Sequence, residues 1–408
     1  MGEILFLAHR IPFPPDRGDK IRSHHVLKAL SALAPVHVAA FLDDVNDQAY
    51  ESDLARLAAS YCLTKRSKSL PFAGIEAIAK GRPLSLAAFH DRKLEAYVRE
   101  LIANRDIDTI YVFSGQMAQY VPQGFRGRVV ADLVDVDSAK FEAYAAKGRG
   151  PRAWMERREG RLLRQEEARI CETSAVTLLI SEAEAGLLLS RLDPDCGPVR
   201  AMGNGLDAIS FDPSLVSAEP QMKAHGAPRI VFTGQMDYAP NIEAAIRAID
   251  RVLPLIRRTC PQATLHIVGR NPPPAILARS GRDGVEVWGR VADIRPWLTA
   301  ADVALIPLDV ARGVQNKVLE AMAMALPVVL SPGAATGIDA LDGRDFVVRD
   351  GDAAMARAVI DLARAPEAAR VMGDAARQWI VANASWEAAL ARLPEYVGMV
   401  GEVANDAA

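Results

Sequence analysis

The chain has 408 residues, half of them hydrophobic and 24% charged, with a formal net charge of -3 at pH 7. This length exceeds one ordinary domain and predicts two, each with a substantial core. The balanced charge excludes a general basic field, so we expect no nucleic acid among its partners. Four cysteines without C-x-x-C or zinc-finger spacing are expected to be reduced thiols of a cytoplasmic protein.

The first half of the chain alternates short apolar runs with helical patterns. A predicted strand starts within a few residues of the N-terminus, without the basic region and longer apolar run of a signal peptide. No apolar stretch approaches the roughly 20 residues of a membrane span. Strands are expected at 4–8, 36–41, 109–113, 129–133, 176–180 and 199–202, and helices at 20–33, 92–103 and 139–170.

The alternation starts again after Asn204. Strands are expected at 229–233, 264–268, 285–288, 303–307, 327–330 and 346–348, and helices at 241–252, 294–300, 316–325, 352–363 and 367–380. Continuously apolar strands between helices are typical of parallel, doubly wound sheets. Two such series predict an α/β protein with two Rossmann-like domains facing each other across a cleft.

The domain boundaries are expected in segments with little periodicity. Residues 207–228 contain three prolines and a glycine, which favour a linker. We therefore predict one domain at 1–207 and a second at 208–385. A last helix, within 386–408, is expected to cross back onto the first domain.

The strongest functional signal lies at 312–330, where a Gly-led loop runs into a helix and then a short strand. The start of a helix offers free N–H groups and the positive end of the macrodipole, which hold phosphate. Lys317 stands in the first turn and repels that dipole, so an anion beside it is expected. Glu320 lies roughly 5 Å deeper, where a carboxylate suits ribose hydroxyls. The segment predicts a bound nucleotide.

Several further motifs, taken together with this segment, carry a family resemblance. In chain order they are 12–20 with Arg22, 134–138, 204–207 with Phe211, 234–241, 268–269, 289–293, 301–303, and Glu320-Ala-Met-Ala followed by Pro327-Val-Val. The chain resembles the GT-B glycosyltransferases of family four, the group 1 glycosyl transferases. More narrowly, it is similar to the bacterial exopolysaccharide sugar transferases associated with exosortase systems.

The resemblance implies an activity and a set of site residues, with 1–207 as the acceptor-side domain and 208–385 as the nucleotide-sugar-binding domain. It implies transfer of a sugar from a nucleotide-diphosphate donor to a hydroxyl of a glycan or lipid-linked oligosaccharide, with retention of configuration and without a metal or other cofactor. Catalytic roles fall to Lys317, Arg312 and Asp137. The donor-binding residues would be Gly18, Asp19, Gly234, Gly269, Gly313, Val314, Gln315, Asn316 and Glu320, and the acceptor side would hold Asp135, Arg22 and Ser114.

Two positions depart from the family's pattern. The loop 234–241 lacks the Arg and Lys that many members carry, and Arg312 stands where the first of two glutamates separated by seven residues is usual. We expect Arg312 and Lys317 together to carry the phosphate charge. The simpler alternatives are a surface cation at Arg312 and an ordinary i,i+3 pair of Lys317 with Glu320.

The candidate residues of the first half also have simpler interpretations. Gly18 and Asp19 precede the helix at 20–33, so Asp19 could be its N-cap. Asp135 and Asp137 form the Asp-x-Asp pattern that binds a metal in GT-A transferases. In a GT-B protein, where helix dipole and basic side chains replace the metal, they would contact sugar hydroxyls. Asp137 or Ser138 could equally cap the following helix.

The helix expected at 139–170 carries nine Lys and Arg residues. This face could contact anionic lipid at the inner surface of the plasma membrane, or it could be an ordinary solvated surface. Three alternatives to the transferase stay open: a GT-B nucleotide-sugar epimerase, a non-catalytic GT-B-like binding protein, and a metal-dependent GT-A transferase.

Overall fold

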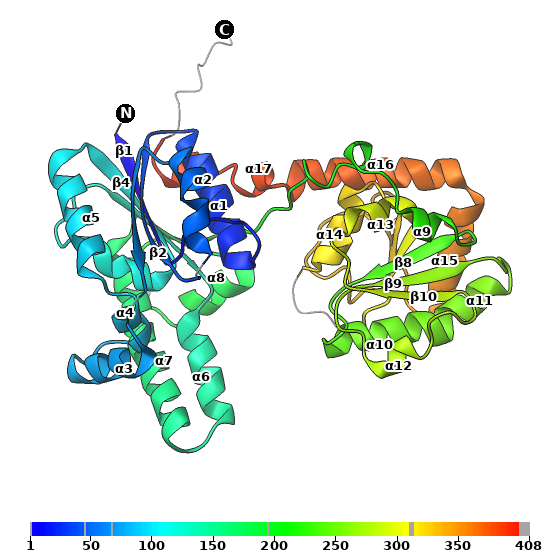
Figure 1. Ribbon diagram of the computed structural model, residues 1–408, viewed down its shortest axis with the longest axis horizontal. Coiled ribbons are helices and arrows are strands. Elements are labelled where there is room, and N and C mark those ends of the chain that lie inside the picture. The colour runs from blue at the N-terminus through cyan, green and yellow to red at the C-terminus, as the bar shows by residue number, and fades with distance from the viewer. Residues whose placement is uncertain (1, 45, 67, 194–195, 310–313, 400–408) are drawn as a thin grey trace, which may run out of the picture. The chain divides into compact units, whose positions relative to one another are not determined.

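The computed structural model describes residues 2–44, 46–66, 68–193, 196–309 and 314–399. The chain forms two compact units, one from the N-terminal part up to Asn204 together with the chain from Ala389 onward, and one from Gly205–Ala388. Each unit contains a parallel sheet with helices packed on it (Figure 1), which confirms the predicted α/β class. None of the helices in the described part of the chain has both the length and the apolar character needed to cross a bilayer.

The first unit is built on a seven-stranded sheet in the order β3-β2-β1-β4-β5-β6-β7. Its strands are β1 (Glu3–Ala8), β2 (Val36–Leu42), β3 (Ser60–Lys65), β4 (Ile107–Phe113), β5 (Arg128–Val134), β6 (Val176–Leu179) and β7 (Val199–Ala201). All neighbouring pairs are parallel, with Ile4 opposite Val36 and Thr109 in the central register. The strand order reverses between β1 and β4, where ligands of such sheets usually bind.

The first unit's helices cover both faces of its sheet. They are α1 (Gly18–Ser31), η1 (Asp47–Tyr50), α2 (Glu51–Ala55), α3 (Leu70–Ala79), α4 (Leu84–Ala88), α5 (Arg92–Asn104), η2 (Gly115–Tyr120), α6 (Asp137–Lys147), α7 (Gly150–Thr173) and α8 (Glu182–Leu189), with α18 (Leu393–Tyr396) from the C-terminal part. Buried side chains such as Leu5, Ala39 and Ile110 form the core of this unit.

The single helix predicted at 139–170 is wrong, because the chain folds there into the α6–α7 hairpin that projects from the first unit (Figure 1). Gly148 ends α6 in an extended conformation, and Gly150 has a φ of 78° at the first position of α7. Pro151 follows in the first turn of α7, a position that needs no N–H donor. This Gly-x-Gly-Pro sequence breaks the helix and reverses the chain.

The second unit has a six-stranded sheet in the order β10-β9-β8-β11-β12-β13. Its strands are β8 (Arg229–Thr233), β9 (Thr264–Val268), β10 (Val285–Gly289), β11 (Val303–Ile306), β12 (Val328–Leu330) and β13 (Val347–Val348). The strand order reverses between β8 and β11. Phe232, Ile267 and Leu305 are among the fully buried residues of a separate core.

The second unit's helices begin and end close to the predicted bounds. They are η3 (Pro213–Leu215), α9 (Pro220–Lys223), α10 (Ala239–Arg247), the π-helical turn η4 (Ala248–Val252), α11 (Leu253–Arg257), α12 (Pro274–Leu277), α13 (Arg295–Ala300), α14 (Asn316–Ala323), α15 (Asp352–Arg364), α16 (Pro366–Asn383) and α17 (Trp386–Ala389). The continuous last helix predicted from residue 386 is wrong: α17 stops at Ala389, and α18 starts again with Pro394 in its first turn.

The C-terminal segment completes the first unit, although it follows the second in the sequence. The Arg128 Nε on β5 donates to the Tyr396 backbone oxygen at 2.6 Å, and the Thr109 hydroxyl on β4 donates to the Val397 oxygen at 3.4 Å. These contacts join α18 to two central strands. The chain therefore passes from one unit to the other twice.

A buried histidine lies beside the sheet of the second unit. His266 on β9 is fully buried, with the Trp288 Nε1 donating to its Nδ1 at 3.0 Å and the Thr264 hydroxyl 2.9 Å from its Nε2. Burial, followed by the nearby His225 and Arg229, lowers the pKa of His266 to about 4. The ring is therefore neutral at pH 7.

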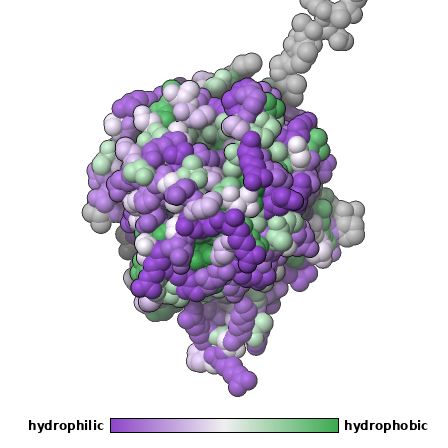
Figure 2. Space-filling model, turned by 90° about the vertical axis from the view of Figure 1, so that its right-hand side faces the viewer, coloured by the Kyte–Doolittle hydropathy of each residue, from purple (hydrophilic) through white to green (hydrophobic). Residues whose placement is uncertain are grey.

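Exposed hydrophobic residues are unevenly distributed between elements. Figure 2 shows a face that is mostly hydrophilic, with hydrophobic residues in small groups. Elsewhere α3 exposes three large hydrophobic side chains, Phe72, Ile75 and Ile78.

Candidate functional site

A cavity of about 660 Å³ opens at the carboxyl ends of β8 and β9, next to the start of α14. Ligands of doubly wound sheets bind at such ends, close to the point where the strand order reverses. The lining residues are Thr233, Gly234, Gln235, Asn241, Val268, Gly269, Arg270, Arg290, Val291, Ala292, Ile294, Val314, Gln315, Asn316, Lys317 and Glu320. Seven of the predicted donor-site residues, including Lys317, are thus brought together here.

Gly234 and Gly269 allow the backbones at the ends of β8 and β9 to lie against each other. A Cβ on Gly269 would stand 1.6 Å from the Gly234 carbonyl oxygen, which no side chain could tolerate. Gly234 has a φ of 152°, and a Cβ there would meet Asn241 at 2.9 Å. The two glycines therefore have a structural reason to be where they are, and they leave the floor of the cavity free of side chains.

The start of α14 faces this cavity without an acidic residue or a side-chain cap. The N-cap Gln315 makes no capping hydrogen bond with its side chain, and the first turn holds no Asp or Glu. The first N–H groups of a helix have no acceptor within the helix. They are therefore available to an anion, which the positive end of the macrodipole also favours.

Lys317 is held in this cavity by neutral partners. Its Nζ donates to the Asn241 side-chain oxygen and lies 5.2 Å from the centre of the Phe232 ring. Asn241 is itself fixed by donating to the Gln235 backbone oxygen at 2.8 Å. Burial lowers the pKa of Lys317 to about 8, and Glu320 only partly offsets it. No carboxylate forms an ion pair with this ammonium in the described part of the chain.

Glu320 lies one turn deeper on α14, as the spacing predicts. Burial raises the pKa of its carboxyl group, and the charge of Lys317 opposes that rise. The i,i+3 pair considered from the sequence does not close into a hydrogen-bonded ion pair, since the Lys317 ammonium is bound by Asn241 instead. Glu320 can therefore accept hydrogen bonds from a ligand.

Two arginines in this cavity were not assigned to the donor phosphates from the sequence. Arg270 and Arg290 directly follow Gly269 and Gly289 at the ends of β9 and β10, and both line the cavity. Together with Lys317 they bring three cations to one Glu320 carboxylate. They supply positive charge that the loop 234–241 lacks. Their signal in the sequence was their position directly after a strand.

The remaining residues of this loop are only partly described. Val314 is 46% exposed, and Gln315 and Asn316 lead directly into α14. Arg312 and Gly313, to which the sequence assigned phosphate contacts, lie outside the described residues.

Asp19 in the first unit is fully engaged with neighbouring side chains. Its carboxylate accepts hydrogen bonds from Arg10 at 2.7 Å and Arg17 at 2.8 Å and lies 3.2 Å from the His9 ring nitrogen. Burial alone would raise its pKa, but these hydrogen bonds hold the pKa well below the ordinary value. Asp19 lies in the first turn of α1 and does not cap it, since Arg17 is the N-cap residue. Gly18 has no atom near its Cβ direction, so it borders open space.

Arg22 has a structural role within the first unit, and its buried side chain is not presented to an acceptor. Its side chain is 1% exposed and pairs with Asp132 through two hydrogen bonds of 3.0 and 3.1 Å. Its remaining nitrogen donates to Gly203 and Asn204. Tyr111 donates to the same Asp132 carboxylate at 2.9 Å. This buried network ties α1 to β4, β5 and the end of the unit.

Two residues at the carboxyl ends of β4 and β5 adopt left-handed backbone conformations. Ser114 has a φ of 77° and Val134 a φ of 70°. This conformation is a strained outlier for a β-branched residue such as Val134, and strain of this kind clusters at functional sites. The Ser114 hydroxyl donates to the Gln116 side chain at 2.7 Å. The sequence included Val134 only as the first residue of the motif 134–138 and gave it no role.

Asp135 and Asp137 stand on either side of the turn from β5 into α6. Asp135 is exposed as a residue, but its carboxyl group is partly desolvated, and this desolvation together with the charges of Glu184 and Asp137 raises its pKa. Burial also raises the pKa of Asp137, against the effect of Lys140, whose Nζ is 3.7 Å away. No set of three or more His, Cys, Asp or Glu side chains among the described residues is arranged to hold a metal ion.

The N-capping roles considered for Asp137 and Ser138 are wrong. The cap of α6 comes from α7, where the buried Glu167 accepts from the Ser138 N–H at 2.9 Å and from its hydroxyl at 2.5 Å. Glu159 on the same helix accepts from the N–H groups of Leu84 and Ser85 at the start of α4. Carboxylates of α7 thus stabilise the first turns of two other helices.

Several cations of α7 have partners within the protein. Arg152 and Arg169 pair with glutamates of the same helix. Arg158 donates to the carbonyls of Ala77 and Arg82, and Arg164 donates to that of Arg191. The predicted basic face is therefore in large part tied to the fold.

Comparison with known proteins identifies relatives of both the second unit and the whole fold. Residues 227–365 match the family Glycosyl transferases group 1. The GDP-mannose-dependent alpha-(1-6)-phosphatidylinositol monomannoside mannosyltransferase of Mycolicibacterium smegmatis is 37% identical over 228 residues, which is 50% of this chain and 58% of that enzyme. The chain thus spans little more than half the length of this relative.

Solved structures extend the similarity to nearly the whole chain. HepE from Anabaena, solved with UDP and glucose, superposes with a TM-score of 0.58 at 14% identity, over 98% of this chain and 100% of that one. Sucrose-phosphate synthase from Thermosynechococcus elongatus gives 0.57 at 17% identity, over 97% and 98%. At such identities the likeness shows the fold, which is that of the GT-B glycosyltransferases.

Proposed function

We propose that this chain, a GT-B protein whose residues 227–365 belong to the group 1 glycosyl transferases, transfers a sugar from a nucleotide-diphosphate sugar to an acceptor hydroxyl. The observation that carries the proposal is the ammonium group of Lys317. It stands in the cavity at the start of α14, held by an amide oxygen, and no carboxylate of the described residues pairs with it. Such a group needs an anion, and the helix start beside it binds the same anion.

The diphosphate of the donor would occupy this position, with its ribose toward Glu320. Negative charge grows on the diphosphate as the bond to the sugar breaks. Lys317, the N–H groups at the start of α14, and the guanidinium groups of Arg270 and Arg290 would stabilise that charge. Stabilising charge that develops in the transition state is usually the largest catalytic contribution.

The same arrangement supports a proposal for the stereochemistry and for the metal requirement. An oxygen of the leaving diphosphate can accept the proton of the acceptor hydroxyl on the face that the leaving group departs from. This route gives retention of configuration without a protein nucleophile. Because cationic side chains neutralise the diphosphate, we propose that the reaction needs no metal.

The acceptor is proposed to be a glycan or a lipid-linked oligosaccharide, and the role exopolysaccharide biosynthesis at the inner face of the plasma membrane. Asp135, Asp137 and Ser114 would meet the acceptor, because they gather at the carboxyl ends of β4 and β5 in the first unit. The strained backbone of Val134 supports this position. For the donor, the name of the mannosyltransferase relative points to GDP-mannose, whereas HepE was solved with UDP and glucose, so the donor panel includes both GDP- and UDP-sugars.

The test is nucleotide release from a panel of UDP- and GDP-sugars, with and without EDTA, followed by analysis of the product anomer. We expect acceptor-dependent release of one nucleotide that persists in EDTA. Lys317→Ala should lower turnover about a hundredfold or more. Lys223→Ala, which removes an exposed lysine of the same unit, should leave turnover unchanged.

Other outcomes would identify the alternatives. A change of the nucleotide-sugar itself without acceptor would indicate an epimerase. Binding of nucleotide-sugars without any turnover would indicate a binding protein, and loss of activity in EDTA would refute metal independence. An inverted product would refute retention while leaving sugar transfer intact.

A further inference from the structure

Helix α3 in the first unit exposes its large hydrophobic side chains, whereas a helix that only packs on a core would bury them. Its inward face consists of small residues, with Ala73 fully buried and Ala77 1% exposed. Its large residues point outward, since Phe72 is 61%, Ile75 70% and Ile78 56% exposed. Three large hydrophobic side chains on one exposed helix face are typical of an interaction surface. We refer to these three residues as the α3 face.

The α3 face is held firmly by the rest of the unit. Arg158 on α7 donates to the carbonyl of Ala77 at 2.8 Å and to that of Arg82 at 3.1 Å, at the C-terminal end of α3. Lys68, just before α3, donates to the Ala87 carbonyl of α4 at 3.3 Å. The helix is therefore presented in a fixed orientation.

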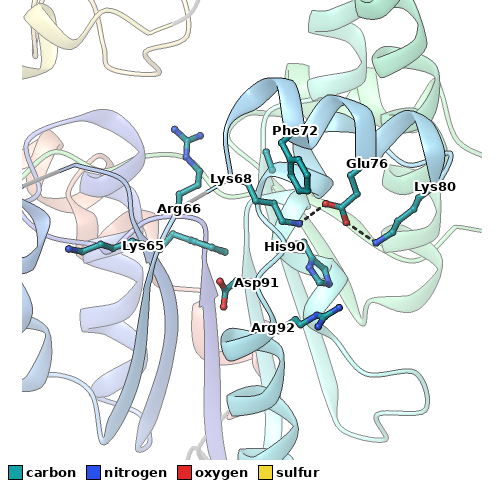
Figure 3. A pocket seen from close by; sticks show the side chains of 11 residues that line it. Lys65, Arg66, Lys68, Phe72, Glu76, Lys80, His90, Asp91 and Arg92 are labelled. Carbon is teal, nitrogen blue, oxygen red and sulfur yellow. Dashed lines mark hydrogen bonds and ion pairs between the residues drawn. The ribbon is translucent and has the colours of Figure 1, made fainter.

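A basic pocket of about 470 Å³ adjoins the α3 face, and Phe72 lines both. Figure 3 shows Lys68, Glu76 and Lys80 joined in a row beside Phe72, with His90 and Arg92 next to them. The lining residues are Phe41, Lys65, Arg66, Lys68, Phe72, Glu76, Lys80, Ala88, His90, Asp91 and Arg92. Five Lys and Arg residues thus face two carboxylates.

The fold uses only part of the positive charge of this pocket, in which Arg66 pairs with Asp43 at 2.9 Å. Glu76 accepts from both Lys68 and Lys80 at 2.7 Å, so one carboxylate serves two cations. Among the described residues, Lys65 and Arg92 have no ion pair. An anion bound here would complete the charge balance.

We propose that the α3 face and the basic pocket together form a membrane-docking surface, in which Phe72, Ile75 and Ile78 enter the lipid and the pocket receives the phosphate of an anionic phospholipid. This inference deepens the proposed location at the inner face of the plasma membrane and rests on that part of the proposed function, whereas the proposed sugar transfer does not depend on it. A bilayer surface offers apolar chains directly beside phosphate groups, which matches the adjacency of the two features. An acidic peptide would satisfy the cations but leave the three outward side chains in water.

The test is co-sedimentation of the full chain with vesicles of phosphatidylcholine alone and of equimolar phosphatidylcholine and phosphatidylglycerol. We expect binding only to the second, weakened by salt. Phe72→Asp and Ile75→Asp should each lower the binding about tenfold or more. The matched control, Val371→Asp, changes a 55% exposed hydrophobic residue on α16 of the other unit and should bind normally.

The pocket is tested separately with Lys65→Ala and Arg92→Ala, which remove no ion pair of the described structure. Each should weaken binding about fivefold, whereas Arg56→Ala, at an exposed arginine just after α2, should have a smaller effect. Equal binding to both vesicle types would overturn the proposal. So would full competition by soluble glycerol phosphate, unchanged binding of the α3-face variants, or an equally tight, Lys65-dependent complex with polyglutamate.

Because vesicle binding is measured without donor or acceptor, its failure leaves the proposed transfer untouched. Conversely, Lys317→Ala should bind vesicles like the unaltered chain. Thermal melting of each variant establishes that a loss of binding does not result from unfolding, and the lipid and salt dependence of the unaltered chain tests the proposal without any variant.

Discussion

The charge of Lys317 makes the proposed donor site sensitive to pH in a range where few other groups titrate. Burial lowers the pKa of this ammonium to about 8. In the free protein it is therefore almost fully charged at pH 7 but only about one-tenth charged at pH 9. If the donor diphosphate needs the ammonium, its affinity falls about tenfold over this interval. The affinity stops falling once the binding free energy lost equals the contribution of the charge-assisted hydrogen bond. That contribution is about 1.5–3 kcal/mol, or ten- to a hundredfold in affinity.

The measurement is calorimetric titration of the full chain with UDP and with GDP from neutral to alkaline pH at constant ionic strength. The variant Lys317→Arg keeps its charge across the whole range, so its profile should be flat. Lys317→Met should bind weakly at every pH. The reasoning is refuted if the affinity of the unaltered chain stays constant, or if Lys317→Met shows the same decline.

Three further predictions concern the stability of the fold. His266 has a pKa of about 4 in the folded protein, below its ordinary value of 6.5, so between these values the unfolded chain binds one more proton than the folded one. The free energy of unfolding is therefore highest above pH 6.5 and falls by about 3 kcal/mol toward pH 4. Thermal melting of the unaltered chain and of His266→Gln measures this, and an equal acid loss in both would contradict it. Arg22→Ala leaves the Asp132 carboxylate buried without its partner and should cost about 3–5 kcal/mol in urea unfolding; a loss below about 1 kcal/mol would show that the pair is not needed. Gly269→Ala brings a methyl group against the Gly234 carbonyl oxygen and should lower the free energy of unfolding by about 1–3 kcal/mol or more. It should also abolish nucleotide binding, and normal binding in calorimetry would show that the ends of β8 and β9 can separate.

The parts of the fold that could be predicted were those encoded locally. Continuously apolar strands such as β8 and β9 are each followed by a Gly and then a helix, so a few neighbouring residues suffice to identify them as strands of a parallel α/β sheet. The edge strand β3 was missed because its side chains are mostly half-buried and mixed in polarity, which gives no clean period. The break between α6 and α7 was readable in Gly148-Arg-Gly-Pro151, and the charge run on either side obscured it.

The candidate site was predictable along α14 and unpredictable across strands. Lys317 and Glu320 are joined by one helical turn, so their spacing could be read directly. Arg270 and Arg290 share a cavity with Lys317 only because β10, β9, β8 and β11 are neighbours in the sheet, which no local pattern encodes. Arg22 was assigned to the acceptor side because its buried partner, Asp132, lies 110 residues away in the sequence and no local pattern pairs the two.

The role of α3 also depended on tertiary structure. Its sequence reads as an ordinary apolar helix, and the three large residues would be assigned to a core. Only the packing of Ala73 and Ala77 shows that the other side faces outward.

The return of the C-terminal segment to the first unit constrains how this protein can be divided. A gene fragment that stops at Asn204 would lack α18, and the carbonyl groups of Tyr396 and Val397 would be missing from β5 and β4. The first unit can be produced alone only as a fusion of two separate coding stretches, whereas Gly205–Ala388 forms a continuous insert. Swapping donor modules between related enzymes therefore requires two junctions, and exchange at a single crossover would leave a mismatched α18 on the recipient sheet.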